Sequence, residues 1–78
     1  MDLLQFTRHF ESAIESVTPG SLQPVSEFRH EIAGWDSLAA LSVLAMIDAE
    51  YEVTVKANDF IACETIADVF KLVEAQKS

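Results

Sequence analysis

Apolar residues near the start of the chain follow the spacing of an α-helix. They recur every three or four positions, at Leu3, Phe6, Phe10, Ile14 and Val17. This spacing places them on one face of a helix, so the pattern predicts a helix over residues 3–17. Thr18-Pro19-Gly20 follows directly and ends the pattern, because proline and glycine interrupt helices.

The next segment, residues 18–35, keeps neither a helical nor a strand period, so a long ordered loop is expected. Loops of more than about 12–15 residues in compact domains tend to be functional. The apolar residues of this segment are expected to hold it over the helices. They are Leu22, Val25, Phe28, Ile32 and Trp35.

A second helix is predicted over residues 37–50. Asp36 stands directly before it, and an aspartate in that position accepts the free backbone N–H groups of the first turn. Across residues 38–47 the only polar side chain is Ser42, so most of the helix circumference must face protein, a ligand or a partner. The pattern makes this the central helix of the fold.

The remainder of the chain predicts two further helices. YEVTV at 51–55 alternates like a strand, but a lone strand has no partner, so an extended connection is expected. Asn58 or Asp59 is predicted to cap a short helix over residues 60–62, and Thr65 with Asp68 resembles a capping box. The last helix carries one apolar face, formed by Ile66, Val69, Phe70 and Val73.

Together these elements predict an all-α fold, a small antiparallel four-helix bundle with three principal helices and one short one. The 78 residues, with only two glycines and two prolines, fit a single domain over residues 1–78. A chain of this length buries about 60–65% of its unfolded surface. That leaves little interior for a buried active site, so an enzyme is not expected.

The charge balance excludes several kinds of partner. Thirteen acidic residues against five basic ones give a net charge of −8, which repels nucleic acid and anionic membranes and attracts basic proteins. No apolar run reaches the roughly 20 residues of a membrane span. The N-terminal sequence MDLLQFTRHF lacks the pattern of a secretion signal, so the expected location is the cytoplasm.

Residues that carry metal or hydrolytic chemistry are sparse. His9, His30 and Cys63 have no ligand spacing between them, so no metal site is expected. A hydrolase would need Ser37 as nucleophile with His30 as base. The sequence around Ser37 shows neither a nucleophile elbow nor a glycine-rich oxyanion hole, and Asp36 is committed to the helix cap, so this hypothesis is disfavoured.

Ser37 has two interpretations on spacing alone. Asp36 as cap and serine as the first helical residue are both common in helices that carry no function. However, a hydroxyl at the end of a long loop is accessible to a modifying enzyme. A phosphate attached there would lie near the positive end of the helix dipole.

The motifs resemble those of one family across essentially the whole chain. GWDSL before an apolar helix, then EYEVTV, NDF and ETIADVF, is similar to the sequence of an acyl carrier protein. The resemblance implies that 4′-phosphopantetheine, taken from coenzyme A, is esterified to Ser37, with Asp36 and Leu38 as flanking recognition residues. It also implies a non-catalytic carrier that is a substrate of a phosphopantetheinyl transferase and holds acyl intermediates as thioesters.

The resemblance further implies partner enzymes that visit the arm. These are an acyl-loading ligase or transferase and ketosynthase-type or acyltransferase enzymes with basic docking patches. Residues 31–55 contain no lysine or arginine, so their acidic side chains are expected to steer such patches, although an acidic face also serves solubility. The docking candidates are Glu31, Asp48, Glu50 and Glu52. A shuttle of this kind is expected to be a monomer.

Several positions depart from the family pattern. Familiar fatty-acid carriers have acidic residues soon after the serine motif, where this chain reads Ala39, Ala40, Ser42 and Val43. We interpret this as a dedicated carrier of fatty-acid-like, polyketide or other specialised lipid biosynthesis. An aminoacyl or peptidyl carrier of the same fold and an unmodified acidic helical adaptor are the alternatives, and Trp35 favours acyl cargo.

Overall fold

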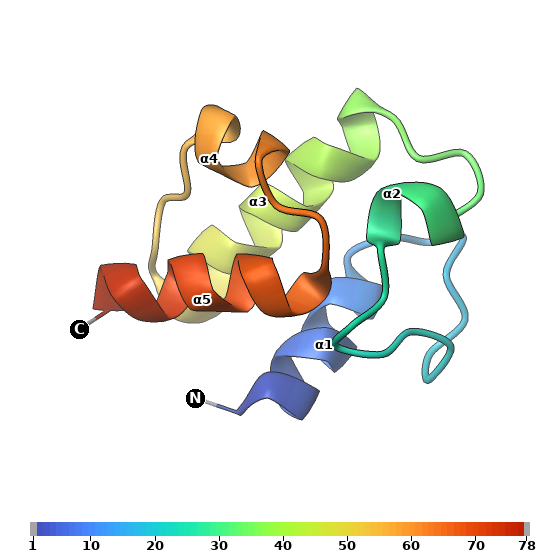
Figure 1. Ribbon diagram of the computed structural model, residues 1–78, viewed down its shortest axis with the longest axis horizontal. Coiled ribbons are helices and arrows are strands. Elements are labelled where there is room, and N and C mark those ends of the chain that lie inside the picture. Colours follow the sequence, from blue (N-terminus) through green and yellow to red (C-terminus); the bar gives the residue numbers. More distant parts are fainter. Residues whose placement is uncertain (1, 78) are drawn as a thin grey trace.

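The computed structural model describes residues 2–77, which form helices and connecting loops without any strand (Figure 1). The helices are α1 (Leu3–Ser12), α2 (Phe28–Glu31), α3 (Ser37–Tyr51), α4 (Ala57–Ile61) and α5 (Ile66–Lys77). The prediction of a small all-α bundle is confirmed. The structure adds a second short helix, α2, which lies inside the segment expected to be a loop.

Helix α1 is shorter than predicted. The Asp2 carboxylate accepts the Leu4 N–H at 2.9 Å and caps its start, but the helix ends at Ser12 rather than near residue 17. Beyond Ser12 the chain continues in tighter turns, in which Ile14 N–H bonds to the carbonyl of Glu11. These turns keep Ile14 in the core although the helix has ended, which explains why the apolar period outlasts the helix.

A buried carboxylate holds the connection after α1. Glu11 is only 1% exposed, and its two oxygens accept the N–H groups of Gly20 at 2.9 Å and Leu22 at 2.8 Å. Arg8 adds an ion pair at 3.0 Å. Burial by itself would raise the pKa of Glu11, but these hydrogen bonds and the Arg8 charge hold it below its ordinary value. Glu11 therefore fastens the loop to α1, together with Arg8, which also donates to the carbonyl of Leu22 at 3.4 Å.

The segment between α1 and α3 packs largely as expected. Phe28 is fully buried, and Leu22 and Ile32 are buried with it, while the Trp35 ring lies 5.0 Å from the Phe28 ring. The prediction for Val25 is wrong, because this side chain is 77% exposed. Its neighbours explain the difference, since the carbonyls of residues 24 and 26 accept N–H groups at the start of α5 and turn the intervening side chain outward.

Helix α3 begins at the predicted residue. Asp36 is its cap, as expected, and the helix continues one residue further than predicted, to Tyr51. Its end is marked by Glu52, whose φ of 55° lies in the left-handed region. Lys77 of α5 donates to the carbonyl of Tyr51 at 3.1 Å and so satisfies a free acceptor at this end. The chain then runs extended toward α4, as predicted.

The starts of α4 and α5 differ, because α4 has no side-chain cap and α5 has a capping box. Helix α4 begins after Lys56, so the prediction of a cap at Asn58 or Asp59 is wrong, and both residues lie within the helix without capping it. At α5, Thr65 Oγ1 accepts the Asp68 N–H at 3.2 Å and Asp68 Oδ2 accepts the Thr65 N–H at 3.1 Å. This reciprocal pair confirms the predicted capping box.

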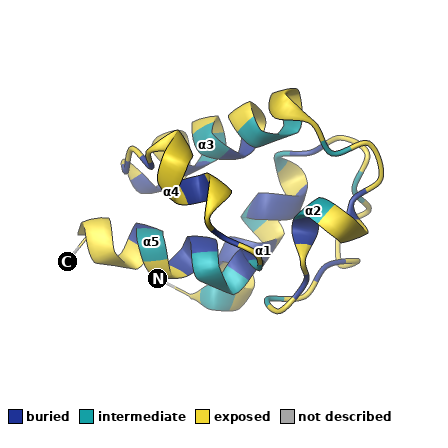
Figure 2. Ribbon diagram, turned by 45° about the horizontal axis from the view of Figure 1, so that its top comes forward, coloured by how far each residue is buried: buried dark blue, intermediate teal, exposed yellow. Residues whose placement is uncertain are grey.

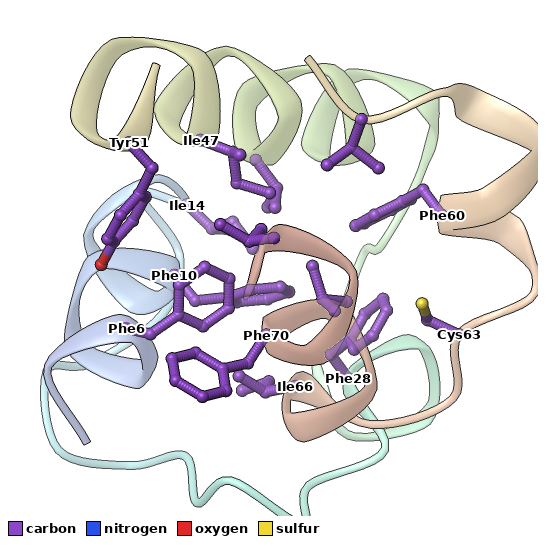
Figure 3. Packing of buried hydrophobic residues seen from close by; sticks show 14 of the residues in the cluster. Phe6, Phe10, Ile14, Phe28, Ile47, Tyr51, Phe60, Cys63, Ile66 and Phe70 are labelled. Atoms are coloured by element: carbon purple, nitrogen blue, oxygen red, sulfur yellow. The ribbon is translucent and has the colours of Figure 1, made fainter. Parts of the chain in front are cut away.

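Apolar side chains from all five helices meet in one cluster (Figure 3). Phe6 of α1 lies 5.4 Å from the Tyr51 ring of α3 and 5.5 Å from the Phe70 ring of α5. Phe28 of α2 lies 5.5 Å from Phe60 of α4. The longer helices α1, α3 and α5 therefore form one end of the core, and the two short helices close the other end.

Candidate functional site

Ser37 is the first residue of α3 and is exposed. The Asp36 carboxylate beside it accepts the Ala39 N–H at 3.0 Å, and Leu38 is 71% exposed. Within residues 2–77 no group hydrogen-bonds the Ser37 hydroxyl or the N–H groups of Ser37 and Leu38. The start of α3 thus presents a free hydroxyl beside unused N–H donors at the positive end of the helix dipole.

A groove of about 490 Å³ opens beside Ser37. One wall belongs to α3, the opposite wall to α4, and residues 35–37 form one border. The lining is mainly apolar: Trp35, Ala40, Leu41, Leu44, Ala57, Phe60 and Ile61 contribute beside Asp36 and Ser37. Arg29 of α2 also borders the groove. A group attached to the Ser37 hydroxyl would therefore lie directly beside this apolar groove.

Helix α3 is packed on one side only. Val43, Ile47 and Tyr51 are its buried residues, whereas Leu41 is 61% exposed despite being apolar. Figure 2 shows that the side of α3 turned away from α5 is mostly exposed. The protein core therefore does not account for the apolar character of the whole helix. The other side of α3 is accessible to a ligand or a partner, which are two of the possibilities that the sequence allowed for this helix.

The acidic residues singled out in the sequence do not form one cluster. Asp48, Glu50 and Glu52 lie at the C-terminal end of α3, about 16–22 Å along the helix from Ser37 at a rise of about 1.5 Å per residue. Glu31 lies apart on α2, where its carboxylate accepts the Glu27 N–H at 2.7 Å. The three residues on α3 stand at the negative end of the dipole, which is unfavourable for stability.

Neither histidine is placed to activate Ser37. Nδ1 of His9 lies 2.7 Å from the Tyr51 hydroxyl at the other end of α3, and its Nε2 lies 3.9 Å from the Glu50 carboxylate. His30 borders a different hollow, together with Glu27 and Glu64 rather than Ser37. The geometry therefore offers the Ser37 hydroxyl no histidine base of the kind a hydrolase needs.

Cys63 is buried, and its Sγ lies 3.5 Å from the carbonyl of Asp59. Burial raises the pKa of this thiol, and the neighbouring Asp68 carboxylate raises it further. Across the described part of the chain no group of three histidine, cysteine, aspartate or glutamate side chains is arranged to hold a metal ion.

Arg29 is the functional candidate that sequence reasoning missed. Its Nη2 donates to the carbonyl of Phe60 at 2.8 Å, and its Nη1 donates to the carbonyl of Cys63. It thereby connects α2 with the end of α4. One signal was available, because Arg29 is the sole lysine or arginine between Arg8 and Lys56.

Comparison with known proteins agrees with this geometry. Residues 12–73 match the protein family described as "Phosphopantetheine attachment site", and this range covers most of the 78 residues. No curated protein and no solved structure gives a match. Of the helices within residues 2–77, none is long and apolar enough to cross a membrane.

Proposed function

Because the chain belongs to the protein family of phosphopantetheine attachment sites, we propose that it is an acyl carrier protein whose prosthetic arm is joined to Ser37. The observation that carries this proposal is the free, exposed hydroxyl at the first residue of α3. The unused N–H groups of Ser37 and Leu38 lie beside it, where they can face the phosphodiester of the arm. Asp36 and Leu38 are the adjoining residues that a transferase would recognise.

Attachment follows from the chemistry of the hydroxyl. The oxygen of Ser37 forms a bond to the phosphorus of the phosphopantetheine half of coenzyme A. The phosphorus–oxygen bond to adenosine 3′,5′-bisphosphate breaks, and the hydroxyl proton passes to a base on the phosphopantetheinyl transferase. The arm, once bound, supplies a terminal thiol for thioester formation. The Ser37 tether makes the next reaction effectively intramolecular whenever the carrier docks on an enzyme.

The groove beside Ser37 supports acyl cargo over aminoacyl cargo. Its walls are alanine, leucine, phenylalanine and isoleucine side chains, which suit a hydrocarbon chain. An amino group in the groove would need an acceptor. The one carboxylate among the residues that line the groove is Asp36, which stands at its border beside Ser37 rather than in the apolar walls. We therefore assign the groove to sheltering an acyl chain.

Docking on partner enzymes is assigned to two ends of α3. Exposed Leu38 and Leu41 near the arm offer apolar contact, while Asp48, Glu50 and Glu52 offer negative charge at the far end. Glu31 contributes charge from α2. Partners with basic patches, namely an acyl-loading ligase or transferase and ketosynthase-type or acyltransferase enzymes, fit such a surface. The uncharged residues just after Ser37 favour a specialised lipid or polyketide pathway.

Intact-mass measurement tests the attachment directly. The protein is incubated with coenzyme A and a phosphopantetheinyl transferase, alongside Ser37→Ala and the matched control Ser42→Ala. Ser42 is also an exposed serine on α3. We expect wild type and Ser42→Ala to gain one phosphopantetheine and Ser37→Ala to gain none. A Ser37→Ala protein that still gains the arm would overturn the assignment, and so would a folded wild type that several transferases leave unmodified.

A further inference from the structure

Helix α4 forms one wall of the groove, yet little in its own sequence fixes its position. It has five residues, no side-chain hydrogen bond caps its start, and Phe60 is its one buried side chain. Helices this short are unstable by themselves, because few backbone hydrogen bonds offset the cost of nucleation. The position of this wall must therefore come from contacts with the rest of the protein.

Arg29 supplies the contacts to the end of α4. Its two terminal nitrogens donate to the carbonyls of Phe60 and Cys63, which lie at and just beyond the helix C-terminus, where carbonyls lack helical partners. The guanidinium also lies 4.9 Å from the Phe28 ring centroid and 5.7 Å from that of Phe60. Arginine suits this task because its planar fork donates in two fixed directions.

Arg29 is not explained by an ion pair. The carboxylate contacts within 4.0 Å that the described residues make involve Arg8 and His9 rather than Arg29. Its charge is instead directed at carbonyls and aromatic faces, beside the groove that begins at Ser37. Charge-assisted hydrogen bonds of this kind are about twice as strong as neutral ones. Arg29 therefore connects α2 to the end of α4, the helix that forms one wall of the groove.

We propose that Arg29 is a specificity-determining residue, which sets the width of the groove and with it the longest acyl chain that the carrier shelters. This inference rests on the proposed function, because it takes the cargo of Ser37 to enter the groove. With Arg29 in place, α4 is held close to α3. Without it, Phe60 still anchors α4 in the core, but the end of the helix is free to move outward and admit a longer chain.

The test uses the whole protein loaded with acyl arms of increasing length. A phosphopantetheinyl transferase transfers the arm from acetyl-, butyryl-, hexanoyl-, octanoyl- and decanoyl-coenzyme A, and loading is verified by intact mass. The melting temperature of each acylated form is compared with that of the same protein bearing the free thiol arm. Wild type is expected to gain stability with chain length up to a limit, beyond which the gain stops or falls.

Three variants distinguish the positioning of α4 by Arg29 from the general effect of losing a positive charge. Arg29→Met removes the charge and both hydrogen bonds but keeps an apolar stem. Arg29→Lys keeps the charge and loses the two-pronged geometry, and it serves also if Arg29→Met does not fold. Lys71→Met, on exposed α5 surface, is the control for charge loss. We expect the limit to move to a longer chain by at least one step in both Arg29 variants and to stay unchanged in Lys71→Met.

Each outcome separates this inference from the proposed function. If both Arg29 variants melt lower in every form but keep the wild-type limit, Arg29 is only structural and the inference is overturned. The same conclusion follows if wild type gains nothing with chain length, since the groove then holds no cargo, while the mass gain still establishes a carrier. Failure to gain the arm at all would instead overturn the proposed function.

Discussion

The Asp36 carboxylate accepts the Ala39 N–H at 3.0 Å. Because of this contact, the cap of α3 is provided by Asp36 and not by the adjacent Ser37. Asp36 satisfies a free donor of the first turn. The hydroxyl of Ser37 is not needed for the cap, and no described residue forms a hydrogen bond with it. The side chain proposed for modification is therefore not the one that holds the helix in place.

Removing the cap should weaken the fold without removing the hydroxyl. We expect Asp36→Ala to lower the free energy of unfolding by about 1 kcal/mol, and Asp36→Asn to stay close to wild type because asparagine caps equally well. Urea unfolding measures both changes. If the carboxylate is also recognised by the transferase, Asp36→Asn will accept phosphopantetheine more slowly although it is stable, and a wild-type loading rate would rule that recognition out.

Glu11 should give the protein an acid-sensitive component of stability. Its hydrogen bonds hold the folded pKa below the ordinary value, so the contribution is complete above the unfolded pKa of about 4.3 and is lost as pH falls through the lower folded pKa. Asp68 acts in the same direction, because N–H groups of Thr65 and Glu64 lower its pKa. We expect unfolding free energies to fall steeply below about pH 4.

Glu11→Gln isolates the part due to that residue. The amide keeps the shape and one acceptor oxygen but places its NH2 group against the N–H donor of either Gly20 or Leu22, so we expect a loss of about 1–3 kcal/mol at neutral pH. The variant should also show a shallower pH dependence than wild type. Glu15→Gln, a similar change at an exposed site, is the control, and equal effects in both variants would contradict the assignment.

The two sides of α3 should respond differently to truncation. Ile47 is fully buried, so Ile47→Ala should cost about 2–5 kcal/mol. Leu41 is 61% exposed, and Leu41→Ala should stay within about 0.5 kcal/mol of wild type. Chemical denaturation of the unmodified protein compares them. A comparable loss in both would mean that the exposed side of α3 is packed after all.

The acidic end of α3 should show a conflict between stability and docking. Asp48→Asn with Glu52→Gln removes two charges from the negative end of the helix dipole, so the melting temperature should rise. Transfer from a partner enzyme with a basic patch should slow several-fold at low salt, with a weaker salt dependence. Unchanged rates at low salt would show that these carboxylates serve solubility alone.

The sequence sufficed for features that depend on neighbouring residues. The caps at Asp36 and at Thr65 with Asp68, and the start of α3, were predicted because each needs only residues three or four positions apart. Features decided by distant contacts were not. The predicted length of α1 was too great. The turns after Ser12 continue the apolar spacing of the helix, although the helix itself has ended.

At the candidate site, too, the sequence predicted the features set by neighbouring residues and not those set by distant contacts. The motif order predicted that Asp36, Ser37 and Leu38 would stand together, since they are consecutive. The groove was not predicted, because it exists only where α4 lies against α3. The contacts of Arg29 were not predicted either, because Cys63 lies 34 positions further along the sequence and reaches Arg29 only through the fold.

The burial of Cys63 has a consequence for how cargo is kept. It is the sole cysteine of the chain, and its thiol is shielded from solvent and has a raised pKa. A second accessible thiolate near the arm would attack the thioester and capture the acyl group on the protein itself. With Cys63 withdrawn into the core, a thiol reagent should count one reactive sulfur per folded, arm-bearing molecule and a second only after unfolding.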